Sequence, residues 1–151
     1  MANLVKKFLS KQDLNDVADA IAESEKRTSG EIRVAIRQKR SKKEQTRSVE
    51  QLARLEFVHL GMVKTEERTG ILIFILLDAR EFFILADEHI NQKVGASTWH
   101  SIAQAMSANF ARNEFRQGLL TAVRSVGDHL AMHFPVLPGD KNELSNKVDI
   151  S

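Results

Sequence analysis

The pattern of hydrophobic and polar positions divides the first half of the chain into helix, strand and helix. After Ser10, apolar residues recur every three or four positions, which predicts an amphipathic helix that ends before Gly30. Ser10 and Asp13 resemble a capping box at its start. Residues 31–38 alternate apolar and polar side chains, as a strand with one buried face does. A second amphipathic helix follows a basic loop and ends at Gly61.

The second half of the chain opens with its most hydrophobic stretch. Residues 71–77 form an unbroken apolar run, typical of a central strand that is buried on both faces. A further apolar run begins at Glu81, so we expect a β-hairpin with Asp78 and Arg80 at its tip. Helical periodicity then predicts one helix from Ser97 towards Asn113 and another over residues 115–133.

This order of elements predicts an α/β fold. The first two long strands are joined through a helix, which makes them parallel neighbours, and the hairpin adds the third strand antiparallel. We therefore expect an α/β/α sandwich with a small mixed sheet and helices on both faces. A chain of 151 residues fits one domain, assigned here to residues 1–144, with a flexible C-terminal tail over residues 145–151.

Composition excludes several classes of function. The 22 Lys and Arg residues nearly balance the 20 Asp and Glu residues, so the net charge of +2 gives little reason to expect a nucleic-acid partner. No cysteine is present, which excludes disulfides, thiolate catalysis and cysteine-bound zinc. The apolar run is far shorter than the roughly 20 residues of a membrane-spanning helix. We expect a soluble, cytoplasmic protein that reaches a membrane only through a partner.

A basic loop follows the first predicted strand, where open α/β sheets usually bind ligands. An anion site there is one hypothesis, since the next helix adds N–H groups at its start. The alternative is a solvated loop, and the absence of aromatic residues argues against binding of single-stranded nucleic acid. The candidate residues are Arg37, Lys39, Arg40, Lys42 and Lys43.

Carboxylates and histidines offer two further candidates. Loop carboxylates hold hard cations such as calcium, and Asp87 follows the third strand while Asp140 and Glu143 lie in the tail. The alternative is that Asp87 only caps a turn. His129 and His133 stand four apart on one helix face, but the glutamate of a metalloprotease motif is missing between them. No fingerprint of an organic cofactor occurs.

Three stretches of the sequence together resemble the TPM-domain family. They are "KRTSGEIRVAIR" (26–37), "TEERTGILIFILLDAREFFILADEHINQKVGASTW" (65–99) and "FPVLPGDKNEL" (134–144). The family includes a plant thylakoid-lumen acid phosphatase, a photosystem II repair factor and many bacterial proteins. The resemblance implies an α/β/α sandwich with a shallow acidic site for a divalent cation such as calcium, and weak acid phosphatase activity.

The resemblance assigns that site to Asp87, with Asp140, Asn142 and Glu143 as contributors if the tail folds back. Asp78 and Arg80 match the family's hairpin, where the role is structural. Ala86 and His89 stand where the family commonly has glycines, a change that restricts the backbone near any cation.

Two hypotheses of function follow. The favoured one is a non-catalytic interaction module that assembles or maintains a membrane-associated complex through a protein partner, with a weak divalent-cation site. The alternative is a metal-assisted acid phosphatase acting on phosphomonoesters, in which Asp87 and a tail carboxylate hold the ion.

Overall fold

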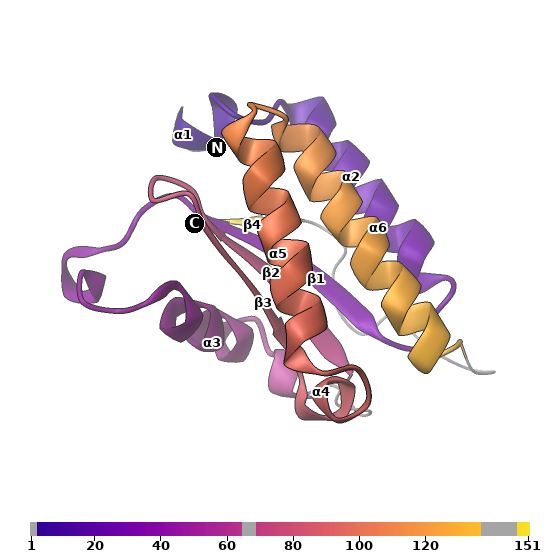
Figure 1. The fold of residues 1–151 in the computed structure, drawn as a ribbon. Helices are drawn as coiled ribbons and strands as arrows, with labels where there is room; N and C mark the ends of the chain where they lie inside the picture. Colours follow the sequence, from indigo (N-terminus) through magenta and orange to yellow (C-terminus); the bar gives the residue numbers. More distant parts are fainter. Residues whose placement is uncertain (1–2, 65–68, 137–147) are drawn as a thin grey trace.

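The computed structural model describes residues 3–64, 69–136 and 148–151, and it shows an α/β/α sandwich (Figure 1). The elements along the chain are α1 (Asn3–Lys6), α2 (Lys11–Glu25), β1 (Glu31–Arg37), the 3-10 helix η1 (Lys42–Glu44), α3 (Val49–His59), the 3-10 helix η2 (Met62–Lys64), β2 (Gly70–Leu76), β3 (Glu81–Ala86), α4 (Glu88–Val94), α5 (Ala96–Ala111), α6 (Phe115–His133) and β4 (Asp149–Ile150).

The sheet has the strand order β3-β2-β1-β4. β1 and β2 are parallel, with Glu31 opposite Gly70, and β2 and β3 form the antiparallel hairpin. This confirms the predicted α/β fold with a small mixed sheet. The turn of the hairpin carries Asp78 and Arg80, and Arg80 adopts a positive φ of 51°. A charged turn thus separates two apolar strands.

The last described residues of the chain form a short strand that the sequence analysis did not predict. Residues 145–151 were expected to be a flexible tail; of these the structure describes 148–151, where Asp149–Ile150 form β4, which pairs in parallel with β1. The Arg33 guanidinium holds this strand through two hydrogen bonds to the Asp149 carboxylate, of 2.6 and 3.3 Å. The Ser151 N–H adds a bond of 2.9 Å to the carbonyl of Ile36.

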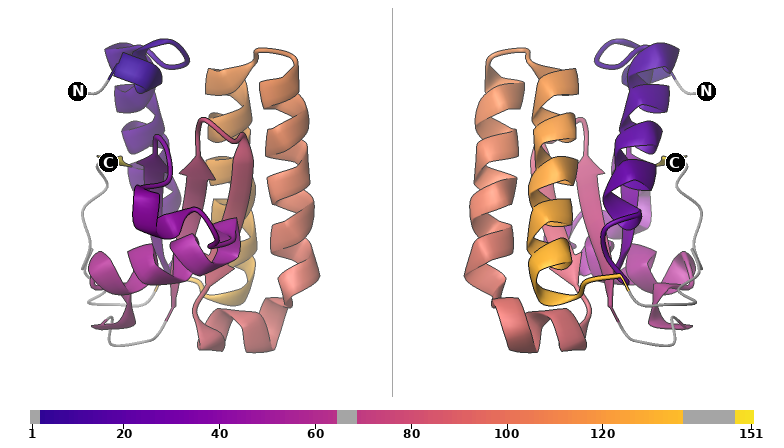
Figure 2. Two further views of the ribbon diagram at one scale, coloured as in Figure 1. Left: turned by 90° about the vertical axis from the view of Figure 1, so that its left-hand side faces the viewer. Right: turned by 90° about the vertical axis from the view of Figure 1, so that its right-hand side faces the viewer.

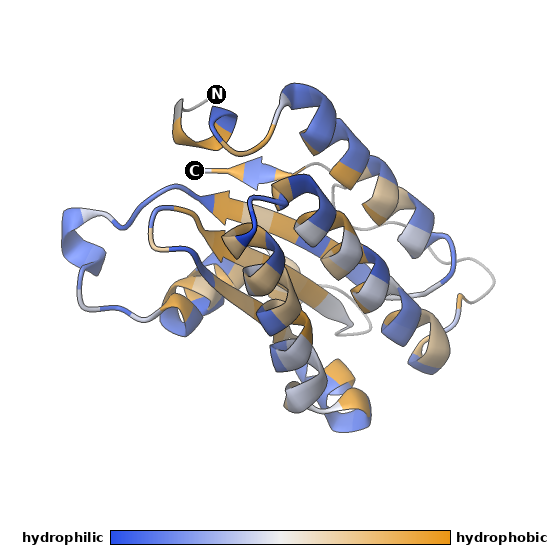
Figure 3. Cartoon of the chain, turned by 45° about the horizontal axis from the view of Figure 1, so that its top comes forward, coloured by the Kyte–Doolittle hydropathy of each residue, from blue (hydrophilic) through white to orange (hydrophobic). Residues whose placement is uncertain are grey.

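Helices cover the two faces of the sheet unequally. α2, α5 and α6 lie on one face and α3 lies on the other (Figures 1 and 2). β2 is buried along its whole length, as its unbroken apolar run predicts, and Figure 3 shows how hydrophobic the sheet is. The expectation that β1 buries a single face is wrong at Ala35, because this small residue packs into the core beneath α3.

Local signals set where the helices begin. Ser10 caps α2 and forms the predicted capping box with Asp13, at 2.9 and 3.0 Å. Ser48 and Gln51 form the same arrangement at α3. Within the described ranges, the helices lack the combined length and apolar character needed to cross a membrane.

Candidate functional site

A groove between α3 and α4 is the surface feature nearest to the predicted cation ligand. We call it the α3–α4 groove; its volume is about 570 Å³. Val58 and Val63, which line it, are 61% and 41% exposed, whereas Phe57 and Leu85 are buried beside them. The α3 side of the groove thus combines apolar residues with Arg54, and the α4 side is polar. Its lining residues are Arg54, Phe57, Val58, Val63, Leu85, Ala86, Asp87, Glu88, Asn91 and Gln92.

Asp87 lines this groove, where β3 passes into α4. Its N–H donates to the carbonyl of Gly70 at 2.9 Å, which continues the hairpin ladder by one residue. Its carboxylate caps α4 by accepting the N–H of Glu88 at 2.7 Å. The side chain is only 6% exposed. The capping role that the sequence left open for Asp87 is therefore present in the structure.

The other two predicted cation ligands, Asp140 and Glu143, lie outside the described residues. Among the residues that are described, no three His, Cys, Asp or Glu side chains gather closely enough to hold a metal ion. The side-chain amide N–H of the nearby Asn91 donates a hydrogen bond to the carbonyl of Ala86, at 3.1 Å. A cation site that includes Asp87 and the tail therefore stays a prediction.

Two arginines of the predicted anion site, Arg37 at the end of β1 and Arg40 in the following loop, form ion pairs. Arg37 donates to Glu44 at 2.6 Å and lies 4.0 Å from Glu56. Arg40 reaches Glu81 at 3.1 Å and the carbonyl of Arg47 at 2.9 Å. These interactions connect this part of the chain to α3 through Glu56 and to β3 through Glu81.

The three lysines of this loop, Lys39, Lys42 and Lys43, are exposed to solvent. The loop also contains Glu44, whose pKa is lowered mainly by the hydrogen bond from the backbone N–H of Ser41 and further by Arg37. A charged Glu44 offsets part of the positive potential that an anion would meet. The anion site stays a prediction that concerns chiefly the lysines.

Arg80 of the hairpin turn packs on aromatic rings. Its guanidinium lies 5.3 Å from the centroid of the Phe8 ring and 5.7 Å from that of Phe115, within cation–π range. It also donates to the carbonyl of Phe110 at 3.4 Å. These contacts join the hairpin to the α5–α6 turn. Asp78, by contrast, is exposed.

Two carboxyl groups meet at the junction of α2 and β1, which the sequence did not single out. Glu25 accepts the N–H of Ile32 at 2.7 Å, and Glu31 is almost fully buried next to it. Burial raises the pKa of Glu25 to about 8, and the neighbouring Glu31 adds to the shift, while Arg33 opposes it. No local sequence signal marks this pair, because a turn brings the two residues together.

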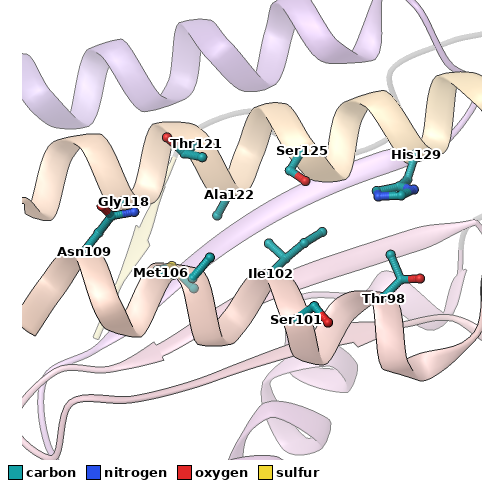
Figure 4. Close-up of a pocket in the computed structure, with 11 residues that line it drawn as sticks. Thr98, Ser101, Ile102, Met106, Asn109, Gly118, Thr121, Ala122, Ser125 and His129 are labelled. Carbon is teal, nitrogen blue, oxygen red and sulfur yellow. The ribbon is translucent and has the colours of Figure 1, made fainter.

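A second hollow lies between α5 and α6, with a volume of about 430 Å³ (Figure 4). Its floor is apolar, formed by Ile102, Met106 and Ala122, and its rim carries hydroxyl groups and His129. The His129 ring meets Trp99 edge-on, at 5.8 Å between centroids. Within the described part of the chain, no hydrogen bond joins His129 to a hydroxyl group, so no bonded nucleophile–base pair is present in this cleft.

Comparison with known proteins defines the class of this chain. The family model of the TPM domain matches residues 4–129, and the chain belongs to this family. Among solved structures, the NMR structure of the BA42 protein from the psychrophilic bacterium Bizionia argentinensis is similar, with 31% sequence identity and a TM-score of 0.84. That similarity covers 95% of this chain and 96% of the BA42 chain. No curated protein matches the chain.

Proposed function

We propose that this TPM domain is a non-catalytic interaction module that binds a protein segment in the α3–α4 groove. The exposed apolar wall of the groove carries the proposal. Val58 and Val63 face solvent at 61% and 41% exposure, directly beside the buried Phe57 and Leu85. Apolar patches rimmed by polar residues are typical of protein-binding surfaces, because covering them removes apolar area from water.

The polar side of the groove indicates the chemistry of the partner. Glu88 is exposed at the start of α4, next to the Asp87 carboxylate. Arg54, on the opposite side, is already paired with Glu50 at 2.8 Å. A segment with apolar side chains and a neighbouring lysine or arginine complements this surface. In accordance with the family resemblance, we place such a segment in a subunit of a membrane-associated complex.

A weak divalent-cation site at Asp87 is part of the same proposal. The site depends on Asp140 and Glu143, since the described residues supply no complete ligand set. Titration of labelled protein with calcium and with magnesium, followed by amide NMR, tests this part alone. We expect shifts at Asp87 and at the tail carboxylates that are lost in Asp87→Asn. An unchanged spectrum at millimolar ion removes the cation site and leaves the groove proposal intact.

The interaction module is tested by selecting peptides from a random display library on the immobilised domain. The selected peptides are synthesised, and their dissociation constants are measured by fluorescence anisotropy. Val58→Glu should weaken binding at least about tenfold, because it places a charge in the apolar wall. Leu55→Glu is the matched control: Leu55 is 47% exposed on the same helix but does not line the groove. Equal binding by both variants, or no selected peptide, would refute the proposal.

A further inference from the structure

Exposed lysines gather at one end of the sheet, where the parallel strands β1 and β2 end. Arg37 and Leu76 are paired at this end, and Lys39 and the η1 loop follow directly after β1. The short helix α1 lies at the same end, because the Phe8 ring packs against Arg80 of the hairpin turn, at 5.3 Å. We call these exposed residues the lysine face: Lys6, Lys7, Lys39, Lys42 and Lys43.

The hairpin turn between β2 and β3 connects the two groups of lysines. The N–H of Asp78 donates to the carbonyl of Gln38 at 3.0 Å, which holds the turn beside the start of the η1 loop. Arg80 of the same turn contacts the ring that follows Lys7 in the chain. Figures 1 and 2 show α1, the hairpin turn and the η1 loop on the same side of the molecule. The fold thus brings lysines from two separate parts of the sequence to one surface.

The positive charge of the lysine face is largely unbalanced. Among the described residues, its lysines form no ion pair. The neighbouring acidic side chains are engaged elsewhere: Glu44 pairs with Arg37 at 2.6 Å and Glu81 with Arg40 at 3.1 Å. Asp78, exposed on the hairpin turn, offsets one of the lysine charges. The small net charge of +2 for the whole chain therefore conceals a local concentration of positive charge.

We propose that the lysine face binds the surface of a membrane that contains anionic phospholipids. Clustered lysines are attracted to such a surface without a shaped pocket, because each ammonium group acts as a compact charge near many headgroups. Single-stranded nucleic acid is favoured by aromatic stacking as well as charge, and residues 38–48 contain no aromatic side chain. The inference goes beyond the proposed function, since it adds a direct contact with the membrane.

The lysine face and the α3–α4 groove lie at opposite ends of the sheet. Asp87, which lines the groove, is bonded to Gly70 at the first residue of β2, whereas the lysine face lies where β2 ends. The 7 residues of β2 separate the two ends by about 20 Å, at about 3.3 Å per residue. A domain that rests on the membrane through its lysines therefore keeps the groove open to a protein segment.

Sedimentation with lipid vesicles tests the proposal. The full chain is mixed with vesicles of phosphatidylglycerol and phosphatidylcholine in equal parts, or of phosphatidylcholine alone, in about 0.1 M salt. We expect binding to the anionic vesicles to be at least about tenfold tighter, since one lysine near such a surface strengthens binding about fivefold. Binding should weaken as the salt concentration rises, because salt screens the attraction.

Matched double variants locate the binding surface. Lys6→Glu/Lys42→Glu takes one lysine from each group and should weaken binding to anionic vesicles at least about twentyfold. Lys26→Glu/Lys93→Glu is the control, because it changes the net charge equally at exposed lysines near the other end of the sheet. It should bind within about threefold of the natural protein, since salt screens charges this far from the membrane. Val58→Glu should also retain binding, so this test is separate from the test of the groove.

Amide NMR of the natural protein supplies a readout that needs no variant. Short-chain phosphatidylglycerol should shift the amides of Lys7 and Lys43, and short-chain phosphatidylcholine should not. Equal binding to both kinds of vesicle, equal loss in both double variants, or shifts confined to the α3–α4 groove would overturn the proposal. Binding of a single-stranded RNA oligonucleotide through these lysines, without binding to anionic vesicles, would identify nucleic acid as the partner and refute the membrane surface.

Discussion

Replacement of Glu25 with glutamine removes a carboxyl group that the fold holds partly buried beside Glu31. Burial, and secondarily the Glu31 carboxyl, raise the pKa of Glu25 from 4.5 to about 8, although Arg33 and the Ile32 N–H favour its charged form. Between these two pH values the folded protein keeps a proton that the unfolded chain has released. The free energy of unfolding must therefore fall as the pH rises through this window.

The size of this effect follows from the pKa shift. A shift from 4.5 to about 8 corresponds to an upper limit of about 5 kcal/mol, at about 1.4 kcal/mol per unit of pH. Because Glu25 is only partly buried, water screens the charge, and we expect about 2 kcal/mol between about pH 5 and about pH 8.5. Glutamine retains an acceptor for the Ile32 N–H and does not titrate. Glu25→Gln should thus gain stability over the natural protein at the higher pH.

Urea unfolding of the natural protein and of Glu25→Gln across this pH range measures the difference in their free energies of unfolding directly. Titrating groups that do not interact with Glu25 contribute equally to both proteins, so they cancel in the comparison. Glu23→Gln is the matched control, because Glu23 lies on the same helix and is exposed. The reasoning would be refuted if the free energy of unfolding of Glu25→Gln differed from that of the natural protein by the same amount from about pH 5 to about pH 8.5.

Two further substitutions test the packing of the fold. In Gly127→Ala, the added Cβ would lie 2.5 Å from Oγ and 2.7 Å from Cβ of Ser24, so α2 and α6 must separate. The cost of this overlap exceeds the gain in helix propensity. Gly127→Ala should therefore lower the free energy of unfolding, measured by thermal unfolding, by about 1–2 kcal/mol, and Ser24→Gly should partly restore it. An unchanged melting temperature would contradict this close contact. Asp149→Asn weakens the pair with Arg33 at 2.6 Å, so hydrogen exchange of the Ser151 amide should accelerate several-fold; unchanged protection would show that the pair does not hold β4.

The hairpin and the long helices were predictable because their signals are local. An unbroken apolar run predicted β2, and its burial along the whole length confirms this. The capping box of Ser10 and Asp13 marked the start of α2. In contrast, β4 has only two residues and depends on the pairing of Arg33 with Asp149, which lies far along the chain. No periodicity exists in so short a strand, so the sequence alone gave no reason to expect it.

The candidate site was less predictable than the fold. Asp87 was proposed as a site residue from its position after a strand, whereas the apolar wall of the groove was not predicted. A signal for it exists in the sequence: Val58 is apolar, yet the buried stripe of α3 runs through Leu52, Ala53 and Phe57. Apolar residues outside the buried stripe of a helix point to a surface that another chain covers.

The central claim, that the α3–α4 groove binds a protein segment, is tested most directly by mapping a display-selected peptide with amide NMR. The account predicts shifts at Val58, Val63 and Leu85, which disappear in Val58→Glu and persist in Leu55→Glu. Shifts centred on Ile102 and Met106 in the cleft between α5 and α6, with none along α3 or β3, would contradict it.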